Sequence, residues 1–322
     1  MKNLLPLLAY LFLMSIILVS CTKEVQIDIP PHEEKIVIDG AIETGQPPII
    51  FISKSNDIYS PTNFEAFLNG FISGATVSVS NGTNTIVLDE LCSNNLPPGT
   101  EQAAAELLGI PEDQLASLNI CAYTSFDQTI WGELGKTYDL NVSYDGKIYT
   151  SQTTIYNPVA LDSVYWKEEE NYPGYGFSWA HLTDPPNENN AYLWEVKKLN
   201  LNSQGGSENN FFVKTFGAFF NDLFFDGMAF EFYYENPTNN QNQNQGNTNE
   251  TDLMYAQGDT VVVKFSSLGN REYEFFDKKY RQIYSAGSPF STPINVPSNI
   301  EGGALGIWAG FSPIYDTLIC QP

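Results

Sequence analysis

The sequence has few of the residues from which most hydrolytic and metal-dependent active sites are built. Histidine occurs twice, as His32 and His181, and cysteine occurs four times. His181 has no nucleophile motif beside it, so nothing indicates a Ser-His-Asp or Cys-His site. The histidines and cysteines also lack the spacing of zinc ligands. We therefore predict no catalytic residues, no metal site and no cofactor.

Positive charge is scarce as well. The chain has 15 Lys and Arg residues against 38 Asp and Glu residues, which gives a net charge of −23. Nucleic acids and anionic lipid surfaces attract a basic face, so neither is an expected partner. Charged residues make up 16% of the chain and aromatic residues 14%. Many aromatic and few charged residues favour an exported β protein over a cytosolic helical enzyme.

The apolar run at the N-terminus, Leu4 to Val19, is short for a membrane span. At ~1.5 Å per residue it extends roughly 24 Å, against a hydrocarbon core of ~30 Å. Lys2 precedes it, as in a signal peptide, and the run ends in Leu18-Val19-Ser20-Cys21, which resembles a bacterial lipobox. The alternative is an uncleaved helix that ends at a chance cysteine. We expect a signal peptide over 1–20, lipidation at Cys21 and a tether over 21–34, with the lipid bilayer as a partner through the acylated cysteine.

Strand patterns begin at Lys35. Alternating apolar residues from Thr76 to Leu88 surround Asn81-Gly82, and a second alternation turns at Asp145-Gly146; both dipeptides are hairpin signals. Tyr138, four residues after Leu134, resembles the tyrosine corner of immunoglobulin-like sandwiches. We predict an immunoglobulin-like β-sandwich over 35–156.

One segment interrupts these strands with good helix formers, at Thr100 to Leu108 and Pro111 to Leu118. Cys92 and Cys121 bracket this helical insertion over 92–121, and an oxidising envelope permits them to pair. The closed loop would stabilise the fold by about 3–4 kcal/mol. We predict the Cys92–Cys121 disulfide, with two alternatives: Cys320 takes one partner, or all three remain reduced.

A second unit follows residue 156. Three strand patterns lie between Ser163 and Val196, and further aromatic strands follow. A helix over about 270–286 is indicated by an apolar stripe at helical spacing, and this stripe is expected to pack on the sheet: Tyr273, Phe276, Tyr280, Ile283 and Tyr284. We predict a second antiparallel β domain over 157–322 carrying one packed helix, and a mainly β fold for the whole chain.

The segment from Ser298 to Gly310, together with Pro293 to Val296, Val37 to Gly40 and Gly135 to Tyr138, resembles a Bacteroidota outer-membrane lipoprotein family catalogued as domain of unknown function 4249. The resemblance covers nearly the whole mature chain, and the segment between Cys92 and Cys121 looks like an insertion in it. The family implies lipidation, residence at the outer membrane and genes often found beside TonB-dependent receptors. It implies no enzymatic residues.

The C-terminal part of this resemblance has no local chemical explanation, so we consider it as a docking surface for a partner. A structural account competes with it, in which the glycines let the backbone pass close to a neighbouring strand. The candidate docking residues are Pro293, Asn295, Asn299, Gly302, Gly303, Gly306 and Trp308.

The function expected from these features is a non-enzymatic outer-membrane lipoprotein, an accessory binding or docking subunit of a TonB-dependent uptake system. The alternatives are an envelope hydrolase acting on glycan or peptide, and a surface adhesin. A convergent pair of carboxylates in a cleft would favour the hydrolase. A large apolar patch away from the anchor would favour the docking subunit. The sequence leaves both the periplasmic and the cell-surface face of the outer membrane open.

Overall fold

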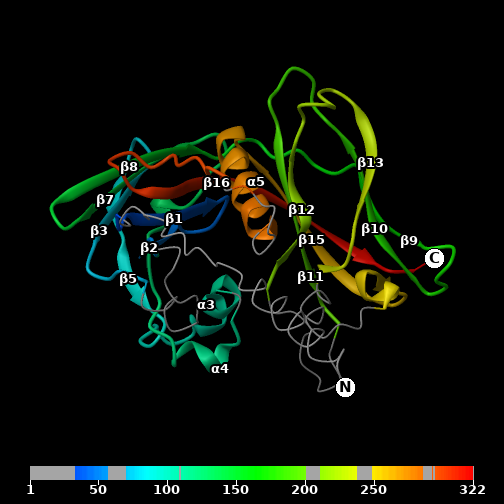
Figure 1. Ribbon diagram of the computed structural model, residues 1–322, viewed down its shortest axis with the longest axis horizontal. Coiled ribbons are helices and arrows are strands. Elements are labelled where there is room, and N and C mark those ends of the chain that lie inside the picture. Colours follow the sequence, from blue (N-terminus) through cyan, green and yellow to red (C-terminus); the bar gives the residue numbers. More distant parts are fainter. Residues whose placement is uncertain are drawn as a thin grey trace, which may run out of the picture. The chain divides into compact units, whose positions relative to one another are not determined.

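The computed structural model describes residues 33–56, 70–108, 110–200, 211–237, 249–285, 292 and 294–321. Cys21 and nearly all of the predicted tether lie outside this part of the chain. Residues Glu34–Pro322 form one unit, in which strands predominate (Figure 1). The predicted mainly β fold class is confirmed.

The centre of this unit is an eight-stranded sheet. In it β1 and β16 pair in parallel, and the other neighbours pair antiparallel. In spatial order the strands are β12 (Val213–Asn221), β11 (Ala191–Lys198), β15 (Thr260–Leu268), β16 (Leu305–Ile319), β1 (Ile36–Glu43), β2 (Ile49–Lys54), β6 (Cys121–Thr124) and β5 (Asp89–Cys92).

Two four-stranded sheets accompany the large one. The first contains β4 (Thr85–Val87), β3 (Thr76–Ser80), β7 (Thr137–Tyr144) and β8 (Lys147–Thr154). The second contains β13 (Ala229–Tyr234), β10 (Tyr175–Thr183), β14 (Tyr255–Ala256) and β9 (Ser163–Glu168), with β10 at its centre.

The side chains of β16 show which face each layer covers. Trp308 packs in the core formed with β3, β7 and β8, and Leu318 packs in the core formed with β10 and β13. Because alternate residues of a strand share a face, both smaller sheets cover the same face of the large sheet. Ile307 and Phe311 point to the opposite face, where they pack with residues of α5.

Local signals in the first half of the chain form as predicted. The β7–β8 hairpin turns at Asp145 and Gly146, with φ of 48° and 71°, as a tight type I′ turn requires. Tyr138 accepts a hydrogen bond from the Glu133 amide (2.9 Å) and donates one to the Trp131 carbonyl oxygen (2.7 Å). The predicted tyrosine corner is therefore confirmed.

The helices also lie where the sequence indicates. The insertion contains α3 (Glu101–Leu108) and α4 (Glu112–Leu115), and α5 spans Asn270–Ser285; short 3₁₀ turns occur at η1 (Gln128–Ile130) and η3 (Glu250–Leu253). The apolar stripe of α5 packs on the sheet only in part. Tyr273, Phe276 and Tyr280 join the core below the helix, whereas Ile283 and Tyr284 are about half exposed. These last two residues are not part of the core, although the Tyr284 ring still packs on Phe216 of β12, with 4.9 Å between the ring centroids.

The division predicted at residue 156 falls between β8 and β9, but the large sheet continues across it. Four of its strands come from the first segment and four from the second. β16 joins them: its first residues pair with β1 and the following ones with β15. The two predicted β domains therefore share one sheet, a long-range pairing that local patterns do not reveal.

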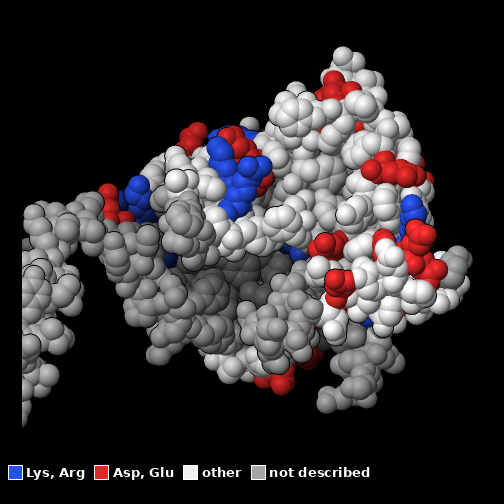
Figure 2. Space-filling view, turned by 45° about the vertical axis from the view of Figure 1, so that its right-hand side comes forward, with Lys and Arg blue, Asp and Glu red and all other residues white. Residues whose placement is uncertain are grey.

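Acidic and basic side chains are distributed unevenly on the face shown in Figure 2. Figure 2 shows Lys and Arg side chains gathered over α5, while acidic side chains are scattered over the rest of the visible face. In the described part of the chain, the helices are too short or too polar to serve as membrane spans.

Candidate functional site

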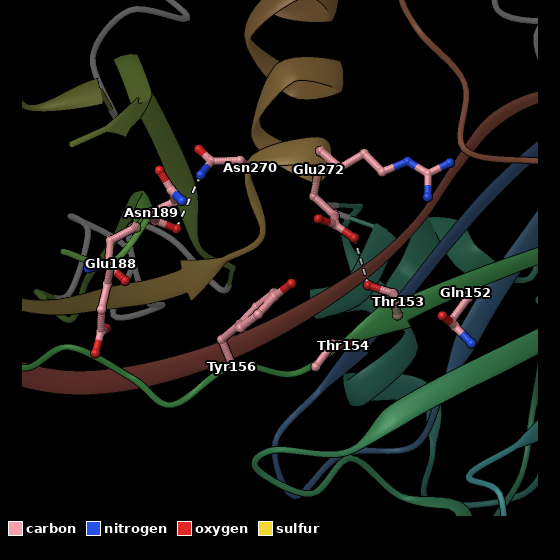
Figure 3. Close-up of a pocket in the computed structure, with 10 residues that line it drawn as sticks. Gln152, Thr153, Thr154, Tyr156, Glu188, Asn189, Asn270 and Glu272 are labelled. Carbon is pink, nitrogen blue, oxygen red and sulfur yellow. Dashed lines mark hydrogen bonds between the residues drawn. The ribbon is translucent and has the colours of Figure 1, made fainter. Parts of the chain in front are cut away.

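A cavity of about 610 Å³ lies where the N-terminal turn of α5, the end of β8 and the loop from β10 to β11 meet (Figure 3). Its volume is typical of small-molecule sites. The residues that line it include a single aromatic ring and no aliphatic side chain: Gln152, Thr153, Thr154, Tyr156, Glu188, Asn189, Asn190, Asn270, Arg271 and Glu272.

Glu272 is the most deeply placed carboxylate of the cavity, only 5% exposed. Burial raises the pKa of Glu272, against the opposing effects of a hydrogen bond from Thr153, its own backbone amide and the charge of Arg271. The Thr153 hydroxyl donates to Glu272 Oε1 (2.8 Å) and accepts from the Gly310 amide (2.9 Å). These bonds fix the first turn of α5 against β8 and β16.

Carboxamides of α5 and of the β10–β11 loop form another part of the lining. The side-chain amide of Asn270 donates to the Asn189 carbonyl oxygen (3.1 Å), which ties α5 to the β10–β11 loop. The Nδ2 atom of Asn190 is buried without a hydrogen-bond partner among the described residues. Tyr156 lies across the cavity from Asn189 and Asn270 (Figure 3), and half of its side chain is exposed. The cavity thus combines hydrogen-bonding groups with one accessible ring.

A cluster of three aspartates lies behind Asn190. Asp184 follows β10, and Asp222 and Asp226 lie in the loop from β12 to β13; their carboxylate oxygens are within 4.8 Å of one another. Asp184 accepts a hydrogen bond from the Tyr192 hydroxyl (2.5 Å), and Asp222 accepts one from the backbone N–H of Asn190 (2.5 Å). Oxygen ligands of this kind suit hard cations such as Ca²⁺, but each carboxylate already accepts a hydrogen bond from the chain itself.

Electrostatic repulsion is built into this cluster. Burial raises the pKa of Asp222, and the neighbouring Asp184 and Asp226 raise it further, while the Asn190 amide opposes them. A carboxyl group whose pKa is raised by folding makes the folded state less stable when it is ionised. The wild-type protein therefore regains stability as the pH falls through the raised pKa.

We expect Asp222→Asn to raise the melting temperature at pH 7.5 by roughly 2 °C, equivalent to about 1 kcal/mol. The amide oxygen of asparagine still accepts from Asn190, and the repulsion with Asp184 and Asp226 is relieved. The measurement is thermal unfolding in EDTA, so that no divalent cation screens the carboxylates. The gain should shrink at pH 4, and Asp145→Asn in an exposed turn should change little. A lower melting temperature for Asp222→Asn in EDTA would contradict this account.

One family model matches this chain. Its description is "Domain of unknown function (DUF4249)", and the match spans residues 22–313. The chain belongs to this family. In the comparisons of this chain with curated proteins and with solved structures, nothing matches. The DUF4249 match includes the cavity, the aspartate cluster and the sheet from β1 through most of β16.

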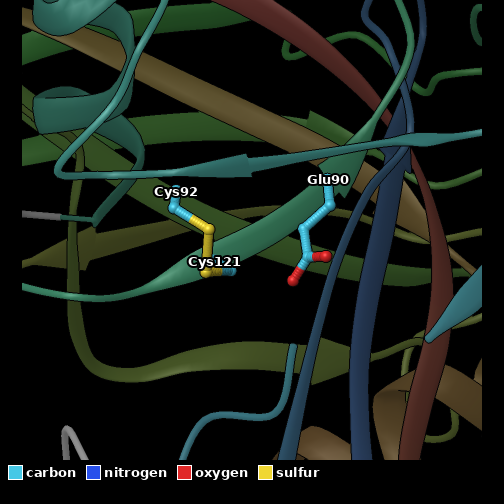
Figure 4. Close-up of side chains that lie close together, drawn as sticks. All are labelled: Glu90, Cys92 and Cys121. Atoms are coloured by element: carbon cyan, nitrogen blue, oxygen red, sulfur yellow. A yellow bond between two sulfur atoms is a disulfide. The ribbon is translucent and has the colours of Figure 1, made fainter. Parts of the chain in front are cut away.

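Two cysteines of this DUF4249 protein are paired as the bracketing pattern favours. Cys92 on β5 and Cys121 on β6 form a disulfide that closes the helical insertion, with Glu90 nearby (Figure 4). Bonded sulfur atoms do not serve as thiolate ligands, so this group is no metal site. Cys320 is a free, buried thiol. Burial raises its pKa to about 12, and the charge of Asp259 contributes to this rise.

The predicted docking residues of the DUF4249 protein separate into three groups. Pro293 lies outside the described residues, as does Cys21, and Asn295, Gly302 and Gly303 are exposed. The other three, Asn299, Gly306 and Trp308, are buried, and this corrects their docking assignment.

The buried group has a structural task. The Asn299 side chain accepts from the Trp308 amide and donates to the Trp308 carbonyl oxygen, both at 2.8 Å. The Trp308 indole donates to the Tyr138 carbonyl oxygen (3.0 Å) and lies against Gly40, where there is no room for a side chain. The distinctive C-terminal segment thus fastens β16 to the N-terminal core.

The cavity itself was not predictable from the sequence. Its residues come from a strand end, a loop and a helix start that lie far apart in the chain. The Asn-rich stretch Asn187 to Asn190 and the first turn of α5 each have ordinary turn and capping compositions. No spacing connects them, so only the fold brings them together.

Proposed function

We propose that this DUF4249 protein is a lipid-anchored accessory subunit of a TonB-dependent uptake system at the outer membrane, and that it binds rather than catalyses. The observation that carries the proposal is the position of the family match. It begins at residue 22, directly after the lipobox cysteine, so the family domain starts where the lipidated chain would start. The family resemblance supplies the TonB-dependent receptor as partner.

The cavity supports binding over hydrolysis. A glycosidase needs two carboxyl groups that flank one bond, about 5–10 Å apart. Glu188 and Glu272 both line the cavity, and Figure 3 shows Glu188 on the β10–β11 loop and Glu272 on α5, on either side of Tyr156 in the view. The Glu272 carboxylate is held by Thr153 in a link between α5 and β8. These two groups therefore fit a hydrogen-bonding site better than a catalytic pair.

The loop from β12 to β13 supports contact with a partner. Leu223, Phe224 and Met228 are exposed, Phe224 by 88% of its side chain. The loop is held by backbone hydrogen bonds from Phe225 and Asp226 to the Asp222 carbonyl oxygen, both at 2.9 Å. A fixed loop with an exposed apolar tip loses little entropy when it enters a partner's groove.

The test is crosslinking in cells, solubilisation of membranes in detergent, and affinity purification with mass spectrometry. A TonB-dependent receptor should be enriched over an unrelated lipoprotein. Cys21→Ala should lose acyl labelling, remain as unprocessed precursor and fail to enrich the receptor. Phe224→Asp should weaken the enrichment, whereas Phe216→Asp, a similarly exposed position on β12, should not. Recovery of the wild-type protein without any receptor would refute the proposal.

A further inference from the structure

The hydrogen-bonding capacity of the cavity limits the ligands that fit it. Four of its side chains are carboxamides, namely Gln152, Asn189, Asn190 and Asn270. Each carboxamide group provides both a donor and an acceptor. No aliphatic side chain lines the cavity, so its apolar surface comes from the Tyr156 ring and from the carbon atoms of polar side chains. Such a lining favours a ligand that carries both polar groups and some apolar surface over a fatty one. The ligand should therefore present many donors and acceptors of its own.

The charged side chains of the cavity lining are two carboxyl groups, Glu188 and Glu272, and one cation, Arg271. The N-terminal end of α5 carries a partial positive charge, but the Glu272 carboxylate takes a hydrogen bond from its own backbone amide there and so meets that charge from within the protein. Arg271 and Glu188 contribute one charge of each sign to the lining. A phosphate or a carboxylate ligand would thus meet no net positive site, and a cation would compete with Arg271. A neutral ligand fits best.

Tyr156 gives this polar site a flat face. It follows β8 in the connection to β9, and half of its side chain is exposed. The ring edge lies so close to Gly269 that a side chain on that glycine would touch it. Tyrosine combines an apolar ring with low conformational entropy, which makes it an effective surface for a ring-shaped ligand.

We propose that this cavity binds a neutral saccharide, whose ring stacks on Tyr156 while its hydroxyl groups bond to Asn189, Asn190, Asn270 and Glu188. Sugar hydroxyls donate and accept, which matches the exposed carboxamides of the lining. The volume of about 610 Å³ falls within the range of small-molecule sites. The proposal adds a ligand to the binding subunit proposed above and does not require the receptor.

The experiment uses the soluble chain that starts after Cys21. The probes are immobilised neutral oligosaccharides of glucose, mannose, galactose and N-acetylglucosamine, followed by calorimetric titration of the best-bound one. Tyr156→Ala should weaken binding at least tenfold, as loss of an aromatic anchor does. Glu188→Ala, an exposed position that spares the fold, should weaken it several-fold. Tyr233→Ala, on β13 and also 50% exposed, should leave it unchanged.

Two results would overturn the proposal. One is that no neutral oligosaccharide binds more tightly to the wild type than to Tyr156→Ala and Glu188→Ala. The other is that a zwitterionic dipeptide, glycylglycine, binds in the cavity more tightly than every oligosaccharide tested, which would make Glu188 and Arg271 a charge-recognising pair. Receptor enrichment is measured separately in membranes, so failure of sugar binding and failure of the uptake role are distinguishable.

Discussion

Replacing Gly306 by alanine is expected to destabilise the protein by roughly 3 kcal/mol or more, a large part of the stability of an ordinary domain. Gly306 lies on β16 opposite Ile38 of β1, and its φ is +117°, which L-residues rarely adopt. A β-carbon there would overlap the carbonyl oxygen of Ile38. The backbone of one strand would have to move, and this pairing joins the two halves of the large sheet.

Gly303→Ala is the matched control. Gly303 also has a positive φ, +90°, but a β-carbon there would meet open space. Gly303→Ala should therefore destabilise the protein only through backbone strain at positive φ, by about 1 kcal/mol. Urea unfolding followed by tryptophan fluorescence measures both variants. Equal stability of the two would show that the close approach to Ile38 is unimportant.

The same comparison decides between the two accounts of the C-terminal segment. A docking surface that includes Gly306 predicts a variant of normal stability that loses its partner. A structural role predicts loss of stability, which the burial of Gly306 and the hydrogen bonds between Asn299 and Trp308 favour. Docking remains a prediction for the exposed Asn295, Gly302 and Gly303.

The parts of the fold that were predictable are those encoded by neighbouring residues. The turn at Asp145-Gly146 needs a positive φ at both positions, and the dipeptide Asp-Gly is one that favours this conformation. The corner at Tyr138 depends on bonds that span seven residues or fewer. The stripe of α5 follows helical spacing, and the core expectation failed only in the last turn, where Ile283 and Tyr284 are about half exposed.

The remainder depends on contacts between distant segments. The pairing of β1 with β16 joins residues about 270 positions apart, and no periodicity within either strand specifies the partner. The cavity likewise depends on the meeting of β8, the β10–β11 loop and α5. Glu195 lies among apolar residues of β11, a pattern that indicates a buried charge. Its partners, Lys214 and Lys264, come from other strands, so the sequence does not identify them.

Those partners form a buried ion network on the face of the large sheet that carries α5. Lys264 on β15 lies 2.6 Å from Glu43 of β1 and 3.4 Å from Glu195 of β11, and Lys214 on β12 lies 2.8 Å from Glu195. Glu195 and Lys264 are both less than 10% exposed. The network thus links strands from both ends of the chain.

The pKa values in this network reflect the pairing. Burial alone raises the pKa of Glu195, but the charges of Lys214 and Lys264 outweigh it, so the pKa lies below its usual 4.5. Burial alone lowers the pKa of Lys264, but Glu195 and Glu43 outweigh it, so the pKa lies above its usual 10.5. Because the pKa of Glu195 is lowered, its carboxylate stabilises the fold above about pH 4.5. This stabilisation is lost as the pH falls through the folded pKa of Glu195. Because the pKa of Lys264 is raised, its ammonium group stabilises the fold below about pH 10.5. This stabilisation is lost as the pH rises through the folded pKa of Lys264.

Lys264→Met is therefore expected to cost about 3 kcal/mol between pH 5 and 10, because it leaves Glu195 buried with Lys214 as its remaining cation. The difference from wild type should narrow as the pH falls from 4.5 through the lowered folded pKa of Glu195. Adding Glu195→Met to Lys264→Met should restore part of the loss, since an apolar pair replaces the ion pair. Urea unfolding at pH 4, 7 and 10 measures these differences.

The control for this prediction is an ion pair of the same length on the surface. Lys278 and Glu274 lie 2.6 Å apart on α5, and both side chains are at least one-third exposed. Solvent screens such a pair, so Lys278→Met should cost less than 0.5 kcal/mol. If Lys264→Met and Lys278→Met proved equally mild, the network would not stabilise the sheet. If the double variant proved as unstable as Lys264→Met alone, packing rather than the uncompensated charge of Glu195 would explain the loss.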